Sequence, residues 1–158
     1  MEGDYSPREV EEKWREKWQQ KGTYEYQGDD DKEVYAIDTP PPTVSGNLHF
    51  GHTYGNTLTD FKARFERMKG KDVYFPFGFD NNGIASERLT ERELDIKHGD
   101  FERFEFQKKV REVCEKYEKN FEETMKEFAF SMDWNNTYKT IQPRVQKISQ
   151  LSFIDLYM

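Results

Sequence analysis

Hydrophobic positions near the amino terminus recur at helical spacing. Val10, Trp14 and Trp18 stand four residues apart, so they share one stripe of a helix. Ser6 and Glu9 have the spacing of a capping box around a proline at the first helical position. A glycine four residues beyond the last tryptophan is a stop signal. The pattern predicts a leading helix, followed by an acidic, turn-prone connector.

Two short apolar runs enclose a second helical pattern. Val34 to Asp38 and Val73 to Phe77 have the length and composition of strands, and residues 51–69 between them have helical periodicity that ends at Gly70. A strand, a helix and a strand in this order form a βαβ unit, which joins parallel strands. The side chains of this helix that we expect to face the core are Tyr54, Leu58, Phe61, Phe65 and Met68.

The second half of the chain is patterned mainly as helix. A short charged helix is predicted over 87–97, with Gly99 beyond its end. From Phe106 to Phe128 the apolar positions step by three or four residues, which predicts a long amphipathic helix with a solvated face of Glu and Lys. A last helix is expected to begin at Pro143, whereas Asp133-Trp134 is expected only to close a loop by packing. The predicted fold class is α/β with a parallel sheet.

The composition narrows the class of protein. The 158 residues are one domain's worth of chain, and an aromatic content of 16% compensates for a hydrophobic content of only 34%. A net charge of −7 disfavours this segment as a main nucleic-acid-holding surface, because backbone binding needs clustered Lys and Arg. Cys114, the only cysteine, is expected to be a packed thiol. Without a membrane-length apolar run or a signal-like amino terminus, a cytoplasmic location and no membrane partner are expected.

The most informative stretch links the first strand to the second helix. Residues 38–52 turn over three prolines and a glycine into a helix headed by His49 and His52. The first amides of a helix lack internal partners and carry the positive end of its dipole, so this end favours anionic phosphate. The two imidazoles add donors there, and Gly51 leaves room for a flat base to approach the backbone. The alternative for either imidazole is an ordinary helix-terminal side chain bonded to the main chain.

A second loop, 77–83, leaves the carboxyl end of the next predicted strand. Ligands in parallel sheets bind beyond these ends, so both loops should face one crevice. Asp80 in this loop is a natural partner for a substrate ammonium group. The alternative is a turn aspartate bonded to its own backbone.

Several strings in the chain resemble those of one enzyme family. Residues 49–52 read His-Phe-Gly-His, residues 40–46 read Pro-Pro-Pro-Thr-Val-Ser-Gly, and residues 78–83 read Gly-Phe-Asp-Asn-Asn-Gly. With the leading Tyr-Ser-Pro helix and Ser-Met-Asp-Trp at 131–134, they resemble the class I aminoacyl-tRNA synthetases, and the valyl members more than the isoleucyl or leucyl ones. The resemblance covers essentially the whole chain, but family members are several times longer.

The resemblance implies a fold and a division of the chain. Residues 1–32 would be an amino-terminal helix and connector, and residues 33–158 the incomplete first half of a nucleotide-binding catalytic domain. That domain is a Rossmann-like parallel sheet, here with a leading helix and long carboxyl-terminal helices.

The resemblance also implies an activity, the ATP-dependent activation of valine and its attachment to tRNA. His49 and His52 would be catalytic and bind ATP together with Gly51, and ATP would enter as its Mg²⁺ complex. The amino-acid site would be formed by Pro41, Pro42, Asn47 and Asp80, and no protein metal site is assigned.

The chain also departs from the family. It contains no Lys-Met-Ser-Lys-Ser loop, and it has Asn81 where relatives often have an acidic residue or histidine. Contacts with tRNA would then come from regions outside this chain, and a complementing carboxyl-terminal polypeptide would be needed for full turnover. In isolation the segment should leave an apolar face uncovered. The alternatives are a non-catalytic nucleotide-binding or interaction module derived from a synthetase, and a nucleotidyltransferase with another acceptor.

Overall fold

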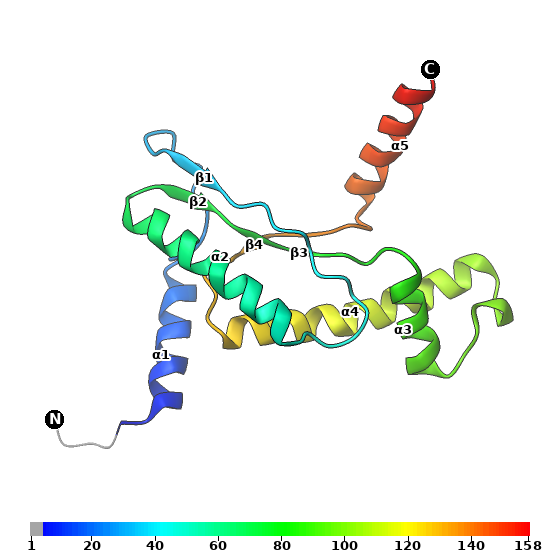
Figure 1. Ribbon diagram of the computed structural model, residues 1–158, viewed down its shortest axis with the longest axis horizontal. Helices are drawn as coiled ribbons and strands as arrows, with labels where there is room; N and C mark the ends of the chain where they lie inside the picture. The colour runs from blue at the N-terminus through cyan, green and yellow to red at the C-terminus, as the bar shows by residue number, and fades with distance from the viewer. Residues whose placement is uncertain (1–4) are drawn as a thin grey trace.

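Two small parallel sheets of two strands each lie in the middle of the molecule, with helices around them (Figure 1). The structure is a computed structural model that describes residues 5–158. Its strands are β1 (Val34–Ala36), β2 (Asp72–Tyr74), β3 (Pro76–Phe79) and β4 (Asp133–Lys139). Its helices are α1 (Pro7–Gln20), α2 (Phe50–Met68), α3 (Ile84–Leu94), the short 3-10 helix η1 (His98–Asp100), α4 (Arg103–Glu127) and α5 (Pro143–Tyr157).

The two predicted strands and the helix between them form the expected βαβ unit, since β1 pairs in parallel with β2. The prediction of one strand from Val73 to Phe77 is wrong in its bounds. The chain changes its pairing partner at the fully buried Phe75, because β2 pairs with β1 whereas β3 pairs in parallel with β4. The main-chain oxygen of Phe75 accepts the Asp133 amide at 2.8 Å, and Pro76 has no amide to donate.

The strand β4 was not predicted, and the expectation that Asp133-Trp134 merely closes a loop is wrong. Residues 133–139 contain Asp, two Asn, Thr and Lys, so they lack the apolar alternation of a strand. The backbone of β3 pairs with them nonetheless, and the Asp133 carboxylate accepts the amides of Tyr26 and Asn135.

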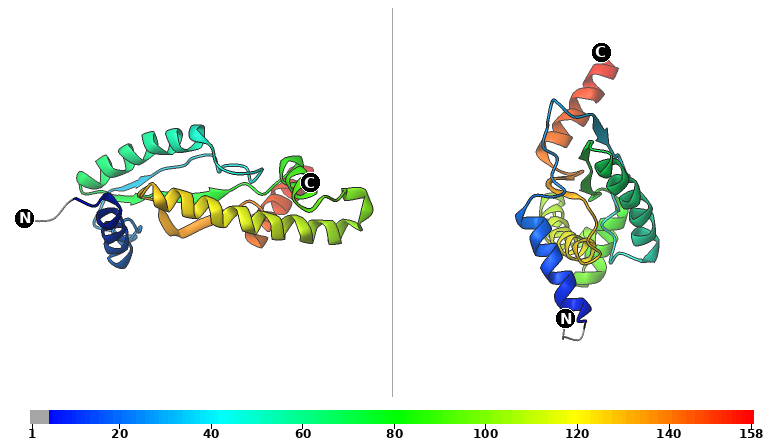
Figure 2. Two further views of the ribbon diagram at one scale, coloured as in Figure 1. Left: turned by 90° about the horizontal axis from the view of Figure 1, so that it is seen from below. Right: turned by 90° about the vertical axis from the view of Figure 1, so that its left-hand side faces the viewer.

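The strands lie between α2 on one side and α4 on the other (Figure 2). The predicted long helix is confirmed as α4, whose Val113, Phe121 and Met125 are buried in the core. Its counterpart on the sheet is a set of three buried phenylalanines, at positions 75, 77 and 79. Aromatic side chains therefore supply much of the core, as the composition suggested. Cys114 is buried among them, which confirms the packed thiol.

The predicted inward face of α2 is wrong. The five apolar side chains expected to be buried are 49–80% exposed, and with Phe50 they form an outward-facing apolar stripe. The inward face is built from Asp60, Ala63 and Glu66 instead. The small Ala63 allows close packing, and the two carboxylates are held by internal partners, so the helix buries a polar face at little cost. This confirms the expectation that an apolar face is left uncovered.

Asp60 ties α2 to the segment that precedes β4. Its Oδ1 accepts hydrogen bonds from the Ser131 amide at 2.6 Å and from the Ser131 hydroxyl at 2.5 Å, and its Oδ2 accepts from Arg64 Nε at 2.7 Å. The Arg67 guanidinium also donates to the Ser131 hydroxyl, at 2.6 Å, and to the main-chain oxygen of Tyr24. We call this group the Asp60 knot (Asp60, Arg64, Arg67 and Ser131). It joins α2, the connector after α1 and the start of β4.

Smaller differences from the sequence predictions occur at helix ends and on α4. Ser6 precedes α1 as expected, but its side chain makes no capping hydrogen bond. The helix α3 ends at Asp95 in a left-handed conformation, four residues before the glycine expected to stop it. Glu118 on α4 is buried rather than solvated. The last helix, α5, begins at Pro143 as predicted, but it buries no residue and projects from the rest of the molecule (Figures 1 and 2).

Candidate functional site

The two loops predicted to face one crevice run side by side. The Val44 amide donates to the main-chain oxygen of Asp80 at 2.7 Å, and the Asp80 amide donates to the main-chain oxygen of Pro42 at 3.0 Å. Thr43 and Asp80 form a parallel bridge. Val44 is fully buried, and its carbonyl accepts the Ser86 hydroxyl at 2.8 Å. The proline-rich loop is therefore fastened both to the Asp80 loop and to α3.

His49 and His52 cap the amino terminus of α2 reciprocally. Nδ1 of His49 accepts the Gly51 amide at 3.1 Å, and Nδ1 of His52 accepts the His49 amide at 3.2 Å. The two ring centroids are 3.9 Å apart, with planes 35° from each other. The structure therefore brings the two imidazoles together at the helix end, with His49 exposed and His52 half-buried. Their bonds to the main chain also match the helix-terminal alternative, so their catalytic role remains a prediction.

The hydrogen bonds of this cap specify what the rings can offer a ligand. Each Nδ1 is an acceptor, so in the neutral rings the proton is assigned to Nε2, which leaves Nε2–H as a free donor on each ring. Partial burial, and secondarily the charge of His49, lowers the pKa of His52 below its ordinary value. At neutral pH, His52 can therefore donate a hydrogen bond from Nε2–H while its ring remains uncharged.

Gly51 has a local reason to be glycine. A Cβ at this position would lie 3.0 Å from Cε1 and 3.1 Å from Nδ1 of His49. A side chain at position 51 would therefore crowd the His49 ring, which accepts the amide of the same position. The exposed backbone at Gly51 also remains open to a flat ligand, but the structure does not test that use.

Asp80 is held on both carboxylate oxygens. Oδ1 accepts the Thr140 hydroxyl at 3.1 Å and the Asn82 amide at 3.2 Å, and Oδ2 accepts the Thr43 hydroxyl at 3.2 Å. The bond from Asn82 is the one expected if Asp80 were only a turn aspartate bonded to its own backbone. A carboxylate has about four lone-pair directions, so capacity for one further donor remains. Asp80 is half-buried, and its role in binding an ammonium group stays a prediction.

The other residues predicted for the amino-acid site lie in the same loop with different exposure. Pro41 and Pro42 are half-buried, and Pro42 is bonded to the Asp80 loop through its carbonyl. Asn47 is exposed, two residues before His49. These placements are compatible with a shared pocket wall but do not test it.

Sequence reasoning missed the contribution of Thr140. It follows β4, so it stands at the carboxyl end of a third parallel strand, beside the end of β3. Its hydroxyl donates to Asp80 and accepts the Asn81 amide at 3.0 Å. Recognising β4 as a strand would have placed Thr140 at this edge, but its polar composition concealed it.

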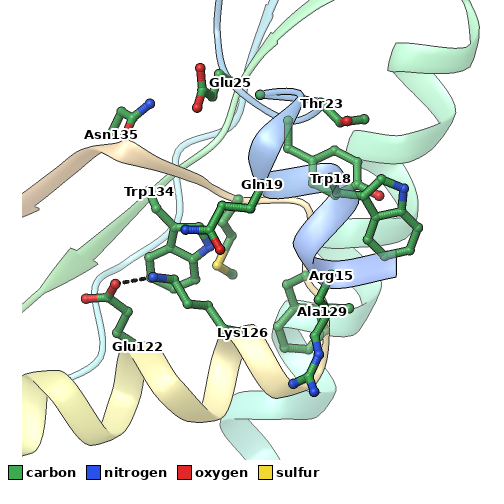
Figure 3. A pocket seen from close by; sticks show the side chains of 14 residues that line it. Arg15, Trp18, Gln19, Thr23, Glu25, Glu122, Lys126, Ala129, Trp134 and Asn135 are labelled. Carbon is green, nitrogen blue, oxygen red and sulfur yellow. Dashed lines mark hydrogen bonds and ion pairs between the residues drawn. The ribbon is translucent and has the colours of Figure 1, made fainter. Parts of the chain in front are cut away.

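A hollow lies elsewhere on the molecule, between α1, the end of α4 and β4 (Figure 3). It measures about 470 Å³, and its lining includes Trp18, Trp134, Arg15 and Lys126. Figure 3 shows Lys126 paired with Glu122 at its edge. The hollow contains none of the predicted site residues, so we place the candidate site at the two joined loops, where the motifs converge.

Comparison with known proteins decides the family. A family profile described as "tRNA synthetases class I (I, L, M and V)" matches residues 13–158. The chain belongs to the class I tRNA synthetases. Within this family it is 59% identical over 157 residues to a valine–tRNA ligase of Haloarcula marismortui, covering 99% of the chain and 17% of that relative. It is 49% identical over 154 residues to a valine–tRNA ligase of Rickettsia rickettsii, covering 97% of the chain and 19% of that relative.

A solved synthetase structure has the same fold. The chain superposes with a TM-score of 0.77 on a LeuRS of Agrobacterium radiobacter K84, solved in a ternary complex with tRNA and LeuAMS. The two are 23% identical, and the match covers 98% of this chain and 18% of that one. This class I synthetase chain thus spans less than a fifth of the length of the relatives it matches. Within residues 5–158, none of the helices has the length and apolarity to cross a bilayer.

Proposed function

We propose that this chain is the part of a valine–tRNA ligase that binds ATP and valine and activates the amino acid. The supporting observation is the junction of the two loops, where the paired imidazoles head α2 and Asp80 is hydrogen-bonded to the proline-rich loop. The identity to valine–tRNA ligases extends across this junction. The division into a leading helix with connector and the first half of a catalytic domain is part of the same proposal.

The proposed step is attack by a carboxylate oxygen of valine on the α-phosphorus of ATP. The new P–O bond forms as the bond to the bridging oxygen breaks, and pyrophosphate leaves with that electron pair. Such a step needs alignment and charge stabilisation more than covalent help. The Nε2–H groups of His49 and His52 would donate to phosphate oxygens, and adenine would rest near Gly51. ATP would enter as its Mg²⁺ complex, with the ion on the phosphates.

Valine would lie against the proline-rich loop. Its ammonium group would take the remaining acceptor capacity of Asp80, with Pro41, Pro42 and Asn47 around it. The activated valine would then pass to tRNA, with tRNA contacts supplied outside this segment. A role in translation and the single buried cysteine favour a cytoplasmic location.

The apolar stripe of α2 supports the need for a complementing polypeptide. Large side chains exposed along five turns of one helix exceed the scattered exposure of an ordinary surface. The strand β1 beside it has exposed residues at both of its ends, Val34 and Ala36. Further sequence, in the same chain or as a separate subunit, would cover this side of the molecule.

Valine-dependent ATP–pyrophosphate exchange tests the proposal, with the chain alone and with any sequence that continues it. The variants His49→Asn and His52→Gln retain side chains suited to a capping box but remove the Nε2 donors. Each should reduce kcat by roughly 10²–10³. The matched control is His98→Ala, because this exposed third histidine pairs with Glu91 rather than with a residue of either loop.

The outcomes separate the alternatives. Exchange that needs valine, falls in both histidine variants and persists in the control supports the ligase. ATP binding without exchange, even with the complementing sequence, would favour the non-catalytic module. Exchange driven by a different acceptor would favour another nucleotidyltransferase.

A further inference from the structure

A buried carboxylate on α4 reaches the loop that carries Asp80. Glu118 is 6% exposed, and its helix neighbours Cys114, Tyr117 and Phe121 are core residues. Its Oε1 accepts the side-chain amide of Asn81 at 2.5 Å, and its Oε2 pairs with the Lys139 ammonium at 2.5 Å. We call this group the Glu118 anchor (Glu118, Asn81 and Lys139). It joins α4, β4 and the Asp80 loop.

Stability alone does not account for a carboxylate at this position. Removing a charge from water is costly, and a well-packed apolar side chain in place of a buried ion pair is often neutral or stabilising. The surrounding core is apolar, and burial raises the pKa of the Cys114 thiol beside Asn81. What an apolar residue could not do here is hold the Asn81 amide in one orientation.

Asn81 is committed to this orientation at a further cost. It is 5% exposed, and its Oδ1 is buried without a hydrogen-bond partner. Its nearest polar neighbours include the Cys114 thiol, which is only a weak donor. The bond to Glu118 keeps Nδ2 turned toward α4 and leaves Oδ1 unsatisfied.

The orientation of Asn81 is transmitted directly to Asp80. The two residues share a peptide bond, and the Asn81 amide donates to the Thr140 hydroxyl, which in turn donates to Asp80 Oδ1. Lys139, the last residue of β4, pairs with Glu118, and the next residue, Thr140, bonds Asp80. The end of β4 therefore contacts both the anchor and the Asp80 carboxylate. Movement of Asn81 would therefore displace the Asp80 carboxylate.

We propose that the Glu118 anchor sets the position of the Asp80 carboxylate for the α-ammonium group of the amino acid, which makes Glu118 a positioning residue. The inference rests on the proposed function and adds to it a residue that does not touch substrate. It predicts a defect confined to ligands with an α-ammonium group, because the imidazole cap that would bind ATP has no bond to the anchor.

The test uses the full chain with any sequence that continues it, in valine-dependent ATP–pyrophosphate exchange. Glu118→Leu fills the same space with an apolar side chain but removes the acceptor of the Asn81 side-chain amide. Its KM for valine should rise about tenfold to a hundredfold, the effect of displacing a binding group by about an ångström, with the KM for ATP within about twofold. Glu118→Gln retains an acceptor for Asn81 and should recover most of the affinity for valine.

Two inhibitors sharpen the readout. Valinol has the ammonium group without the carboxylate, and isovalerate has the carboxylate without the ammonium group. The inhibition constant of valinol should rise in Glu118→Leu in parallel with the KM for valine, whereas that of isovalerate should stay unchanged. The matched control is Glu122→Leu, one turn further along α4, where the carboxylate pairs with Lys126 away from the loop.

Asn81→Ala provides a second route if Glu118→Leu does not fold, because it leaves the Glu118–Lys139 pair in place. It should show the same selective defect, and the double variant should be no worse than the more affected single one. Equal rises for valine and ATP, or an unchanged KM for valine in folded variants, would overturn the positioning role while leaving the ligase intact. A wild-type protein without valine-dependent exchange would remove the proposed function itself, and the inference with it.

Discussion

The Asp60 knot allows a quantitative test of why α2 buries its polar face. Asp60→Ala removes two hydrogen bonds from Ser131 to a buried carboxylate, each worth about 1.5–3 kcal/mol because the acceptor is charged. The pair with Arg64 is partly exposed and adds roughly 0.3–0.5 kcal/mol. Alanine's better helix propensity returns about 0.6 kcal/mol. The free energy of unfolding should therefore fall by about 3–6 kcal/mol.

Urea unfolding followed by circular dichroism measures this loss, and thermal unfolding should show Tm lower by roughly 6–24 °C for a chain of this length. Ser131→Ala removes the hydroxyl, including its contact with Arg67, but the amide bond to Asp60 survives, so the loss should be smaller than in Asp60→Ala. Thr59→Ala, the neighbouring helix position, should change stability by less than about 0.5 kcal/mol. A loss below about 1 kcal/mol in Asp60→Ala, or one no larger than in Ser131→Ala, would refute the assigned role.

Three further predictions concern titration and close packing. The imidazole of His52 should titrate by NMR below the model-peptide value of 6.5, and His49→Gln should raise that pKa by removing a neighbouring charge. Because the pKa of His52 in the folded protein lies below 6.5, the stabilisation from its neutral form is complete above pH 6.5. It declines as the pH falls from 6.5 through the lower folded pKa. Lys62, followed by Lys71 and Lys69, lowers the pKa of Glu66 to about 2, so its stabilisation should be lost between pH 4.5 and about 2, and Glu66→Gln should flatten acid unfolding over that window. Gly78→Ala would place a Cβ against the Tyr138 ring, so unfolding should become easier by about 1–3 kcal/mol, and a smaller residue at 138 should restore part of it.

The loops that carry the candidate site were predictable because their signals are local. Prolines, glycines and the His-Phe-Gly-His string specify a turn into a helix end, and the structure has α2 beginning within one residue of the predicted start. The parallel arrangement of β1 and β2 followed from the same logic of strand, helix and strand. The convergence of two strand ends then placed Asp80 beside the proline-rich loop without further information.

The failures arose where tertiary contacts outweigh hydrophobicity. The α2 periodicity located the helix but not its buried face, because hydrophobicity does not record the partners that let carboxylates be buried. Ser131, from a distant segment, bonds Asp60, and neighbouring lysines pair with Glu66. The strand β4 is polar and pairs through its backbone, which side-chain patterning does not record. Glu118 looks like any charged residue on a solvated helix face until Asn81 and Lys139 are placed beside it.

The projecting helix α5 has a consequence for cooperativity. It buries no side chain, so its fifteen residues are held by main-chain bonds within one segment. An isolated helix of that length is marginal in water, since nucleation is unfavourable and little tertiary packing offsets it. Its amides should exchange with solvent by local opening, many times faster than those of α4, whose protection reports global unfolding. The described chain therefore comprises a cooperative body and an appended segment that melts independently of it.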